Sequence, residues 1–567
     1  MAENPPQDQK SPQPQTGAEN DIDALLRKAR ERHASGSLSE AQHLYQKILE
    51  TRPENAEVQS KLGAALAAQG KIVESESVLR RAIEAEPDLA EAHINLGNVF
   101  QLQGKLDEAV TSLRRALEIN PDQTAAHVNL GNILLKQGNP EDAAGSYSSA
   151  LEIEPEFSQA LNGLGTAFMQ QNKGKEAAET FDQALNIAPD QPEILCNLGN
   201  LLRNQGKYDE AVKTLRKAIA IQPNLIDAHI NLGNTLKSRG EWDGAMDSYQ
   251  QALSLDPENA ETHWNNAQVL LLLGRLEEGW QEYEWRTKCD DFRSLIWKTG
   301  GPPWDGSNLD GKTILIYCEQ GFGDSVQFIR YAQPLAALGA TVIVKCPQKL
   351  QTLFQTVPGV DKAVTRMDKS APYHLQASLH SLPRLLKTDM ESIPAQVPYV
   401  FPPAASTIDL GSDGKQKVGI VWAGSPSHKN DQSRSMSLDY FKPLLDVEGL
   451  AFYSLQFGEP SQDINHFELG GAIVDLSGDL EGFTATAAVL AELDLIISVD
   501  TSTAHLAGAL GKPVWTLLSF VPDWRWLLGR DDSPWYPSMR LFRQNSPGDW
   551  RGVMDNVVKE LRQFLLN

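Results

Sequence analysis

Five polar residues lie close together where an apolar stretch is expected to give way to a helix: Asp500, Thr501, Ser502, Thr503 and His505. The preceding run, Leu495 to Val499, is typical of a buried parallel strand, and a helix of small residues is expected from Thr503. A helix start carries unpaired N–H groups and a partial positive charge, so it suits a phosphate, and neighbouring hydroxyls add donors. The same residue types are also preferred helix caps, so ordinary capping is the alternative interpretation.

A second candidate follows another expected strand, at 313–318, and reads Glu-Gln-Gly-Phe-Gly-Asp. Gly321 and Gly323 permit a close backbone approach to a ligand. The loop lacks the third glycine of a dinucleotide fingerprint and the Gly-Lys-Ser/Thr of a P-loop, so neither nucleotide motif applies. Asp324 lies just inside the next helix. A carboxylate there favours the helix dipole, and at the mouth of a cleft it can instead accept a proton.

Two cations, Lys429 and Arg434, stand in a polar loop that follows a third expected strand, at 418–422. The chain holds 74 acidic and 51 basic residues, so cations at a strand end are unusual in it. They could neutralise a diphosphate. The alternative is a solvated loop without a ligand.

These candidates depend on alternating strands and helices that fall into two blocks. Such alternation predicts two doubly wound, Rossmann-like α/β domains that face one another, with ligands at the carboxyl ends of the strands. The expected N-terminal lobe spans 312–401, a linker rich in Pro, Ala, Ser and Gly spans 402–416, and the second lobe, expected to bind the nucleotide, spans 417–567. Further strands are expected at 341–345, 452–455, 473–476 and 514–518, and helices at 438–445, 484–493 and 550–566.

The N-terminal half is an array of repeats with a period of 34 residues. Prolines recur at 53, 87, 121, 155, 189, 223 and 257, and glycines recur at 63, 97, 131, 165, 199 and 233. A second glycine series has one gap, filled by Asn172, which tolerates a left-handed turn. This is the tetratricopeptide pattern, with seven full units and a partial eighth over 22–293. Such arrays form all-α solenoids whose concave face binds extended polypeptide segments.

Asparagines hold the same position in successive repeats, at Asn95, Asn129, Asn197, Asn231 and Asn265, with Gly163 interrupting the series. A side-chain amide can donate to and accept from a peptide backbone, which favours acceptor binding. Hydrogen bonds between neighbouring helices are an equally weighted alternative. The row resembles the asparagine ladder of the O-linked N-acetylglucosamine transferase family.

Aromatic residues are dense where the repeats end: Trp280, Tyr283, Trp285, Phe292, Trp297 and Trp304. We expect an aromatic junction over 294–311, with these residues packing the repeats against the α/β domains. A stacking site for a sugar or base is the less favoured alternative.

The net charge of −23 argues against generic binding to nucleic acid or to anionic membranes. Four scattered cysteines fit a reducing compartment and no metal site. No run approaches the length of a membrane span, and residues 1–21 form a polar, Pro-rich stretch that predicts a disordered tail. The sequence therefore predicts a cytoplasmic protein.

The second half resembles the GT-B glycosyltransferases related to ADP-heptose:lipopolysaccharide heptosyltransferases. The resemblance rests on Gly323-Asp324, on the loop Val421-Trp-Ala-Gly-Ser and on Asp500-Thr-Ser-Thr-Ala-His505. The whole chain resembles bacterial proteins that fuse tetratricopeptide repeats to such a domain and share Pro522-Asp-Trp-Arg-Trp526. The Thr-Pro that often follows Gly-Asp in true heptosyltransferases is missing, so sugar and acceptor do not carry over.

The resemblance implies a metal-independent, inverting transfer from a nucleotide sugar, with Asp324 as the base. It places the donor on the turn 500–505, and less securely on Lys429 and Arg434, with no cofactor besides the donor substrate. We therefore expect a glycosyltransferase whose repeats capture a protein acceptor at Ser or Thr. A transferase for lipid-linked or polysaccharide acceptors and a non-enzymatic scaffold with a decayed transferase domain are the alternatives.

Overall fold

The computed structural model describes residues 16–293, 301–367, 373–406, 408–411, 414–426 and 430–566. The chain divides into two compact units, Met1–Ala228 and His229–Asn567, and each is described here by itself. The division falls inside the repeat array. Among the described residues, no helix is long and apolar enough to cross a membrane.

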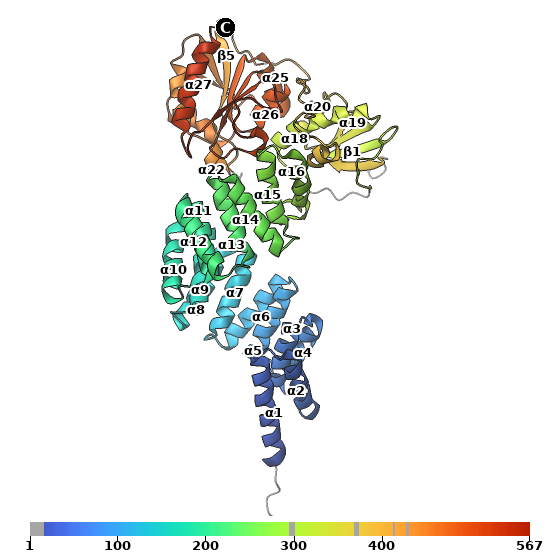
Figure 1. The fold of residues 1–567 in the computed structure, drawn as a ribbon, viewed down its shortest axis with the longest axis vertical. Helices are drawn as coiled ribbons and strands as arrows, with labels where there is room; N and C mark the ends of the chain where they lie inside the picture. Colours follow the sequence, from blue (N-terminus) through green and yellow to red (C-terminus); the bar gives the residue numbers. More distant parts are fainter. Residues whose placement is uncertain are drawn as a thin grey trace, which may run out of the picture. The chain divides into compact units, whose positions relative to one another are not determined.

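The first unit is built from pairs of helices, one pair for each repeat (Figure 1). The helices are α1 Thr16–Ala34, α2 Leu38–Thr51, α3 Ala56–Ala68, α4 Ile72–Ala85, α5 Ala90–Leu102, α6 Leu106–Ile119, α7 Thr124–Lys136, α8 Pro140–Ile153, α9 Ser158–Gln170, α10 Gly174–Ile187, α11 Pro192–Asn204 and α12 Tyr208–Ile221. Helix α1 begins at Thr16, five residues before the expected end of the tail at residue 21, and residues 1–15 lie outside the described residues. The all-α repeat prediction is confirmed.

Both glycine series have a structural cause. The turn glycines from Gly36 to Gly274 have φ values between 74° and 76°, and Asn172 replaces one of them at φ 60°, as predicted. The other series lets two helices approach closely. A Cβ at Gly131 would lie 2.7 Å from the Tyr147 ring, and one at Gly165 would lie 2.6 Å from Phe181. The large side chain sixteen residues later therefore occupies the space that each of these glycines leaves.

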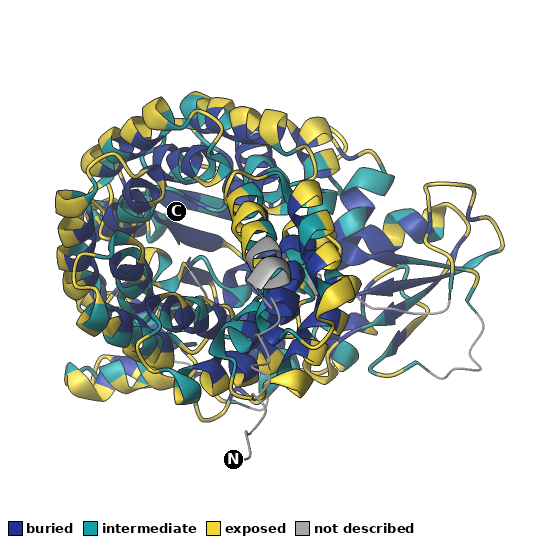
Figure 2. Ribbon diagram, turned by 90° about the horizontal axis from the view of Figure 1, so that it is seen from below, coloured by how far each residue is buried: buried dark blue, intermediate teal, exposed yellow. Residues whose placement is uncertain are grey.

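The second unit begins with repeat helices and continues into two sheets. Its repeat part comprises α14 Trp242–Leu255, α15 Ala260–Leu272, α16 Leu276–Tyr283, the 3₁₀ turn η1 Glu284–Lys288 and α17 Asp290–Arg293, while α13 Ile226–Ser238 spans the division. Figure 2 shows helices striped between buried and exposed faces, whereas the strands visible in it are mostly buried. The contrast fits amphipathic helices beside strands covered on both faces.

The first sheet has four parallel strands in the order β3-β2-β1-β4. Its strands are β1 Thr313–Tyr317, β2 Thr341–Lys345, β3 Lys362–Val364 and β4 Leu375–Ser378, and its helical elements are α18 Phe322–Phe328, η2 Ile329–Tyr331, α19 Ala332–Ala337, α20 Gln348–Phe354, η3 Leu379–Ser381 and α21 Leu382–Leu385. The strand order reverses between β1 and β4, so the loop after β1 lies at a switch point where ligands bind in such sheets.

The second sheet has six parallel strands in the order β10-β9-β8-β5-β6-β7. Its strands are β5 Gln416–Val421, β6 Leu450–Ser454, β7 Ile473–Asp475, β8 Leu495–Val499, β9 Val514–Leu518 and β10 Met539–Arg543. The helical elements are α22 Asp431–Arg434, η4 Leu438–Phe441, α23 Lys442–Leu445, η5 Glu459–Gln462, α24 Asp463–His466, α25 Gly482–Glu492, α26 Ser502–Ala509, η6 Trp524–Trp526 and α27 Trp550–Phe564. The order reverses between β5 and β8. The loops after these two strands are the ones that the sequence marked as phosphate-binding candidates.

Aromatic residues join the last repeat to the sheets. Trp280 and Tyr283 are buried in one core with residues of both sheets, and the Trp280 indole N–H donates to the Thr388 carbonyl oxygen at 3.0 Å. Trp280 and Trp524 meet edge to face, with ring centroids 5.3 Å apart. Trp280, Tyr283 and Trp304 pack as expected, and this shared core joins α15 and α16 to the sheets in one compact unit. Residues 294–300 of the expected junction lie outside the described residues.

Candidate functional site

The loop after β1 and the turn after β8 lie directly against each other. Helix α18 packs on α26 (Figure 1). A Cβ at Gly323 would lie 2.9 Å from His505 Cδ2 and 3.4 Å from Ser502 Cα. Glycine is therefore the residue that allows this contact. The structure brings Gly321, Gly323 and Asp324 together with the predicted donor residues Asp500, Thr501, Ser502, Thr503 and His505.

Asp324 forms an ion pair across the two sheets. Its Oδ1 accepts a hydrogen bond from Arg525 Nη2, and the two residues are 201 positions apart. The Arg525 guanidinium also donates to Gln327 Oε1 at 2.5 Å and to Asp523 Oδ1 at 2.8 Å. A Cβ at Gly321 would lie 2.9 Å from Asp324 Oδ2, so the glycine leaves room for that oxygen. Charge-assisted bonds of this kind fix the orientation of a carboxylate.

The start of α26 carries no side-chain cap. The residue before it, Thr501, has extended backbone angles, but its hydroxyl lies 3.0 Å from Ser498 Oγ and makes no capping hydrogen bond. The alternative interpretation of an ordinary cap therefore does not describe Thr501. The first amides of α26 are left without that partner, as a helix end that receives an anion would be.

The surroundings of His505 and Asp500 shift the pKa values of these two residues in opposite directions. His505 Nδ1 lies 2.9 Å from the Tyr536 hydroxyl, and its ring stacks on Trp526 with centroids 5.2 Å apart. Burial and the nearby Arg525 lower the pKa of His505 well below its usual value. Burial, reinforced by the negative charge of Asp523, raises the pKa of Asp500 to about 6. His505 Nε2 and Asp500 Oδ1 are 3.9 Å apart.

Arg434 reaches the same turn from α22. Its Nη1 donates to the Asp500 backbone oxygen at 3.3 Å, and its Nε donates to Asp431 Oδ1 at 3.3 Å. The side chain is 18% exposed, so it is not the solvated cation of the alternative interpretation. Lys429, the other predicted cation, lies outside the described residues.

Arg525 and Tyr536 complete this cluster, although neither was among the predicted site residues. Arg525 stands in the quoted Pro-Asp-Trp-Arg-Trp motif, so the signal was present in the sequence. Its partner Asp324 comes from a distant strand, and the pattern along the chain does not reveal that pairing.

Three of the predicted acceptor-binding asparagines link neighbouring repeats in the first unit. Asn95 Nδ2 donates to Ser60 Oγ at 3.0 Å, Asn129 Nδ2 to Asn98 Oδ1 at 2.9 Å and Asn197 Nδ2 to Asn162 Oδ1 at 2.9 Å. All three side chains are half-buried. Asn231 and Asn265 are half-buried residues of the second unit. The helix-linking alternative therefore holds for Asn95, Asn129 and Asn197, while peptide binding stays a prediction.

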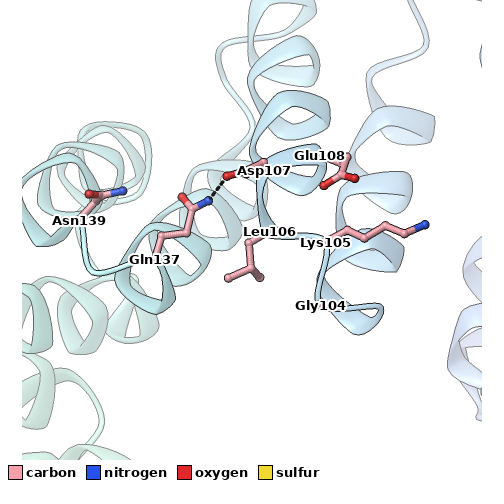
Figure 3. Close-up of a pocket in the computed structure, with 7 residues that line it drawn as sticks. All are labelled: Gly104, Lys105, Leu106, Asp107, Glu108, Gln137 and Asn139. Carbon is pink, nitrogen blue, oxygen red and sulfur yellow. Dashed lines mark hydrogen bonds between the residues drawn. The ribbon is translucent and has the colours of Figure 1, made fainter. Parts of the chain in front are cut away.

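A hollow of about 580 Å³ lies on the first unit, away from these asparagines. Figure 3 shows it between the turn that opens α6 and the turn that opens α8, where Gln137 Nε2 donates to Asp107 Oδ1 at 2.7 Å. Its lining is polar and charged: Gly104, Lys105, Leu106, Asp107, Glu108, Gln137 and Asn139. It includes none of the predicted site residues.

Family models match both halves of the chain. Tetratricopeptide repeat models match 32–98, 102–138, 128–192, 180–213, 199–238 and 233–274. The model described as glycosyltransferase family 9 (heptosyltransferase) matches 465–530. That stretch contains the turn 500–505 and Arg525, but not Asp324.

Individual proteins resemble parts of the chain. Protein FlbA of Caulobacter vibrioides is 29% identical over 324 residues, which cover 52% of this chain and 54% of FlbA, so the chain spans about half the length of that curated relative. The crystal structure of the APC/C hetero-tetramer Cut9-Hcn1 is 20% identical, with a TM-score of 0.40 over 49% of this chain and 55% of that one. A tetratricopeptide repeat protein from Parabacteroides merdae is 16% identical, with a TM-score of 0.39 over 44% of this chain and 99% of its own. The family models show that the chain combines tetratricopeptide repeats with a glycosyltransferase family 9 region, and the family 9 match supports a glycosyltransferase.

Proposed function

We propose that this protein is a GT-B type glycosyltransferase that moves a sugar from a nucleotide sugar to a Ser or Thr hydroxyl of a polypeptide held by the repeats. The observation that carries the proposal is the meeting of two switch points. Asp324 after β1 stands beside the uncapped start of α26 after β8, and Gly323 makes that contact possible. A proton acceptor thus lies next to a helix start that is suited to bind an anion.

In the proposed reaction the acceptor oxygen attacks the anomeric carbon from the side opposite the leaving group, which inverts its configuration. The bond between that carbon and the phosphate oxygen breaks, and the hydroxyl proton passes to Asp324. The nucleoside diphosphate leaves with both bonding electrons. The start of α26, Arg434 and Lys429 are assigned to its developing negative charge, so no step is routed through a metal ion.

The fixed orientation of Asp324 supports its role as the base. Arg525 holds Oδ1, and the Asp324 side chain is 23% exposed. A base must be within hydrogen-bond reach of the proton that it takes, so an anchored carboxylate that is not fully buried suits the task.

The acceptor is assigned to the repeats because their asparagines retain hydrogen-bonding capacity. Asn95, Asn129 and Asn197 donate through Nδ2, and within the described part of the chain no hydrogen bond reaches the Oδ1 of any of them. A carbonyl oxygen left in this way can accept a bond from a peptide N–H without regard to side-chain sequence.

A ligand screen followed by a transfer assay tests the proposal. Uridine, guanosine, adenosine and cytidine nucleotides and their sugars are first compared by thermal shift. A ligand at one hundred times its Kd should stabilise the folded chain by about 2.7 kcal/mol. The sugar nucleotide that binds is then added to cells or lysate with and without the enzyme, and modified products are sought by mass spectrometry.

Sugar on Ser or Thr of a protein supports the proposal. Sugar found only on lipid-linked or polysaccharide material rejects the protein acceptor. No stabilisation by any nucleotide or nucleotide sugar contradicts the transferase activity itself and leaves a scaffold.

A further inference from the structure

The last repeat reaches into the lobe that carries Asp324. We propose that Arg286, in the turn η1 that ends α16, is a positioning residue that holds the Asp324 loop in place for transfer. This inference rests on the proposed function, because it names a part of the repeat array as a support of the proposed base. Arg286 is completely buried, which is rare for an arginine and demands that every charge-bearing contact be satisfied.

One guanidinium ties together the ends of two neighbouring strands. Arg286 Nε donates to Glu319 Oε1 at 2.5 Å, and Nη2 donates to Ser381 Oγ at 2.8 Å. Glu319 follows β1 and precedes Asp324 by five residues, while Ser381 follows β4. Because β1 and β4 are adjacent, Arg286 bridges the switch point from the side of the repeats.

The rest of the guanidinium is anchored within the last repeat. Nη1 donates to the Tyr283 carbonyl oxygen at 3.1 Å and to Glu284 Oε1 at 2.9 Å. The guanidinium carbon also lies 4.9 Å from the centre of the Tyr283 ring. On the side of the lobe, His380 Nδ1 lies 3.7 Å from Glu319 Oε1. Arg286 is therefore a rigid connection, with one end in η1 and the other on the loop.

The same repeat also packs against the residue next to Arg525, the ion-pair partner of Asp324. The Tyr283 ring lies 6.1 Å from the Trp524 ring, and Trp280 meets Trp524 at 5.3 Å. Trp524 precedes Arg525, whose guanidinium carbon lies 4.3 Å from the centre of the Trp524 ring. Residues of α16 and η1 thus contact Glu319 on the Asp324 loop and Trp524 next to Arg525.

A positioning role gives a reason for the buried charges of Arg286 and Glu319. A buried ion pair gives little net stability compared with apolar residues of similar size, so stability alone is a weak reason for Arg286 and Glu319. Directional bonds from a planar guanidinium fix a loop more narrowly than apolar contacts do. A misplacement of about 1 Å at a reacting group can cost about 100-fold in rate.

The test uses the full chain with Arg286→Met, Glu319→Gln and the double variant that carries both changes. Each single variant leaves one buried charge of the Arg286–Glu319 pair without its partner, so we expect its free energy of unfolding to fall. The double variant removes both charges and should regain most of that free energy. The matched control is the pair Arg540→Met and Glu560→Gln, because Arg540 Nη1 and Glu560 Oε2 form an ion pair at 2.6 Å, on β10 and α27.

Two readouts follow. The first is release of nucleoside diphosphate from the sugar nucleotide that gives the largest thermal shift with the wild-type chain. We expect the double variant to lose kcat by about 10- to 100-fold while KM for the donor changes by less than about twofold. Arg286→Lys, which cannot make both bonds to Glu319 and Ser381, should lie between it and the wild type.

The second readout, hydrogen–deuterium exchange of the 319–328 segment, needs no activity. Faster exchange there in the double variant, with no change in β5 and none in the control pair, supports positioning. If the double variant is folded and keeps wild-type kcat, or if the loop exchanges as before, Arg286 has no positioning role. If the wild type transfers no sugar at all, the proposed function fails, and the exchange result still decides whether Arg286 orders the loop.

Discussion

Asp324 and Asp500 occupy similar places in the two sheets, each shortly after a strand next to a switch point, but their surroundings differ. Asp324 is ion-paired with Arg525, which comes from the opposite sheet. Among the described residues, no arginine or lysine forms a salt bridge with the Asp500 carboxylate. Arg434 donates to its backbone oxygen, and His505 Nε2 stands 3.9 Å from its Oδ1. Burial and Asp523 accordingly raise the pKa of Asp500 to about 6.

The different surroundings of Asp324 and Asp500 indicate two different roles, although the sequence motifs alone would allow either carboxylate to fill either role. A carboxylate held by a guanidinium keeps one orientation and can take a proton from a fixed direction. A buried carboxylate with a raised pKa keeps its proton over a wider pH range, and in that range it adds little repulsion toward a phosphate beside it. We therefore expect Asp324 to serve the reaction and Asp500 to shape the donor site, and the predictions below test that assignment.

The largest expected effect is on kcat in Asp324→Asn. Loss of a general base typically costs about 100- to 10,000-fold, and donor binding should be retained because the asparagine can still accept from Arg525. Steady-state kinetics and calorimetry with the donor measure the two quantities. Asp500→Asn is the matched comparison, since it removes a carboxylate from the turn after β8 instead of the loop after β1. A larger loss of kcat in Asp500→Asn than in Asp324→Asn would reverse the two roles.

The second prediction concerns the contact that brings the two carboxylates into one site. Gly323→Ala places a methyl group 2.9 Å from His505 Cδ2, so the loop and the turn must move apart. We expect kcat to fall by about 10- to 100-fold, because reacting groups that are misplaced by a fraction of a bond length lose rate steeply. Overpacking of this kind should also lower the free energy of unfolding by about 1 to 3 kcal/mol.

Gly478→Ala is the control for that substitution, since a Cβ at Gly478 meets no atom within 4 Å. Thermal unfolding and kinetics of the two variants are compared side by side. Equal kinetics in Gly323→Ala and Gly478→Ala would show that the close approach of α18 and α26 is not needed for transfer.

The sequence predicted the repeats and most strands because their signals are local. A helix pair needs a turn residue and a close-packing residue at fixed places, so Gly, Asn172 and Pro recur with the period of the fold. Strands such as β2 and β8 were placed correctly because each is an apolar run. The short β3 and β4 and the mixed sequence of β10, which includes Arg540 and Arg543, gave no comparable signal.

The site was only partly predictable, because its most informative contacts join distant residues. Asp324 and Arg525 are 201 residues apart, and Arg286 and Ser381 are 95 apart. No periodicity connects such pairs, and only the folded arrangement of two sheets and the last repeat brings them together. The residue types at strand ends could be recognised along the chain, whereas their partners could not.

The smallest expected effect is the dependence of stability on Asp500 ionisation. The folded state holds the Asp500 proton up to about pH 6, whereas the unfolded chain releases it near pH 3.9. Wild-type stability should therefore fall as pH rises from about 4 through 6, and above pH 6 the cost of the buried charge stays constant. Asp500→Asn has no such charge. The free energy of unfolding of Asp500→Asn minus that of the wild type should therefore be larger at pH 8 than at pH 4, by about 1 to 3 kcal/mol.

Denaturant unfolding of both proteins at several pH values measures this difference. Asp555→Asn controls for the loss of one negative charge, because Asp555 is exposed on α27. A difference between Asp500→Asn and wild type that does not change with pH would mean that Asp500 is ionised throughout, as a carboxylate with its own cation would be. The contrast with Asp324 would then disappear, and either carboxylate could act as the base.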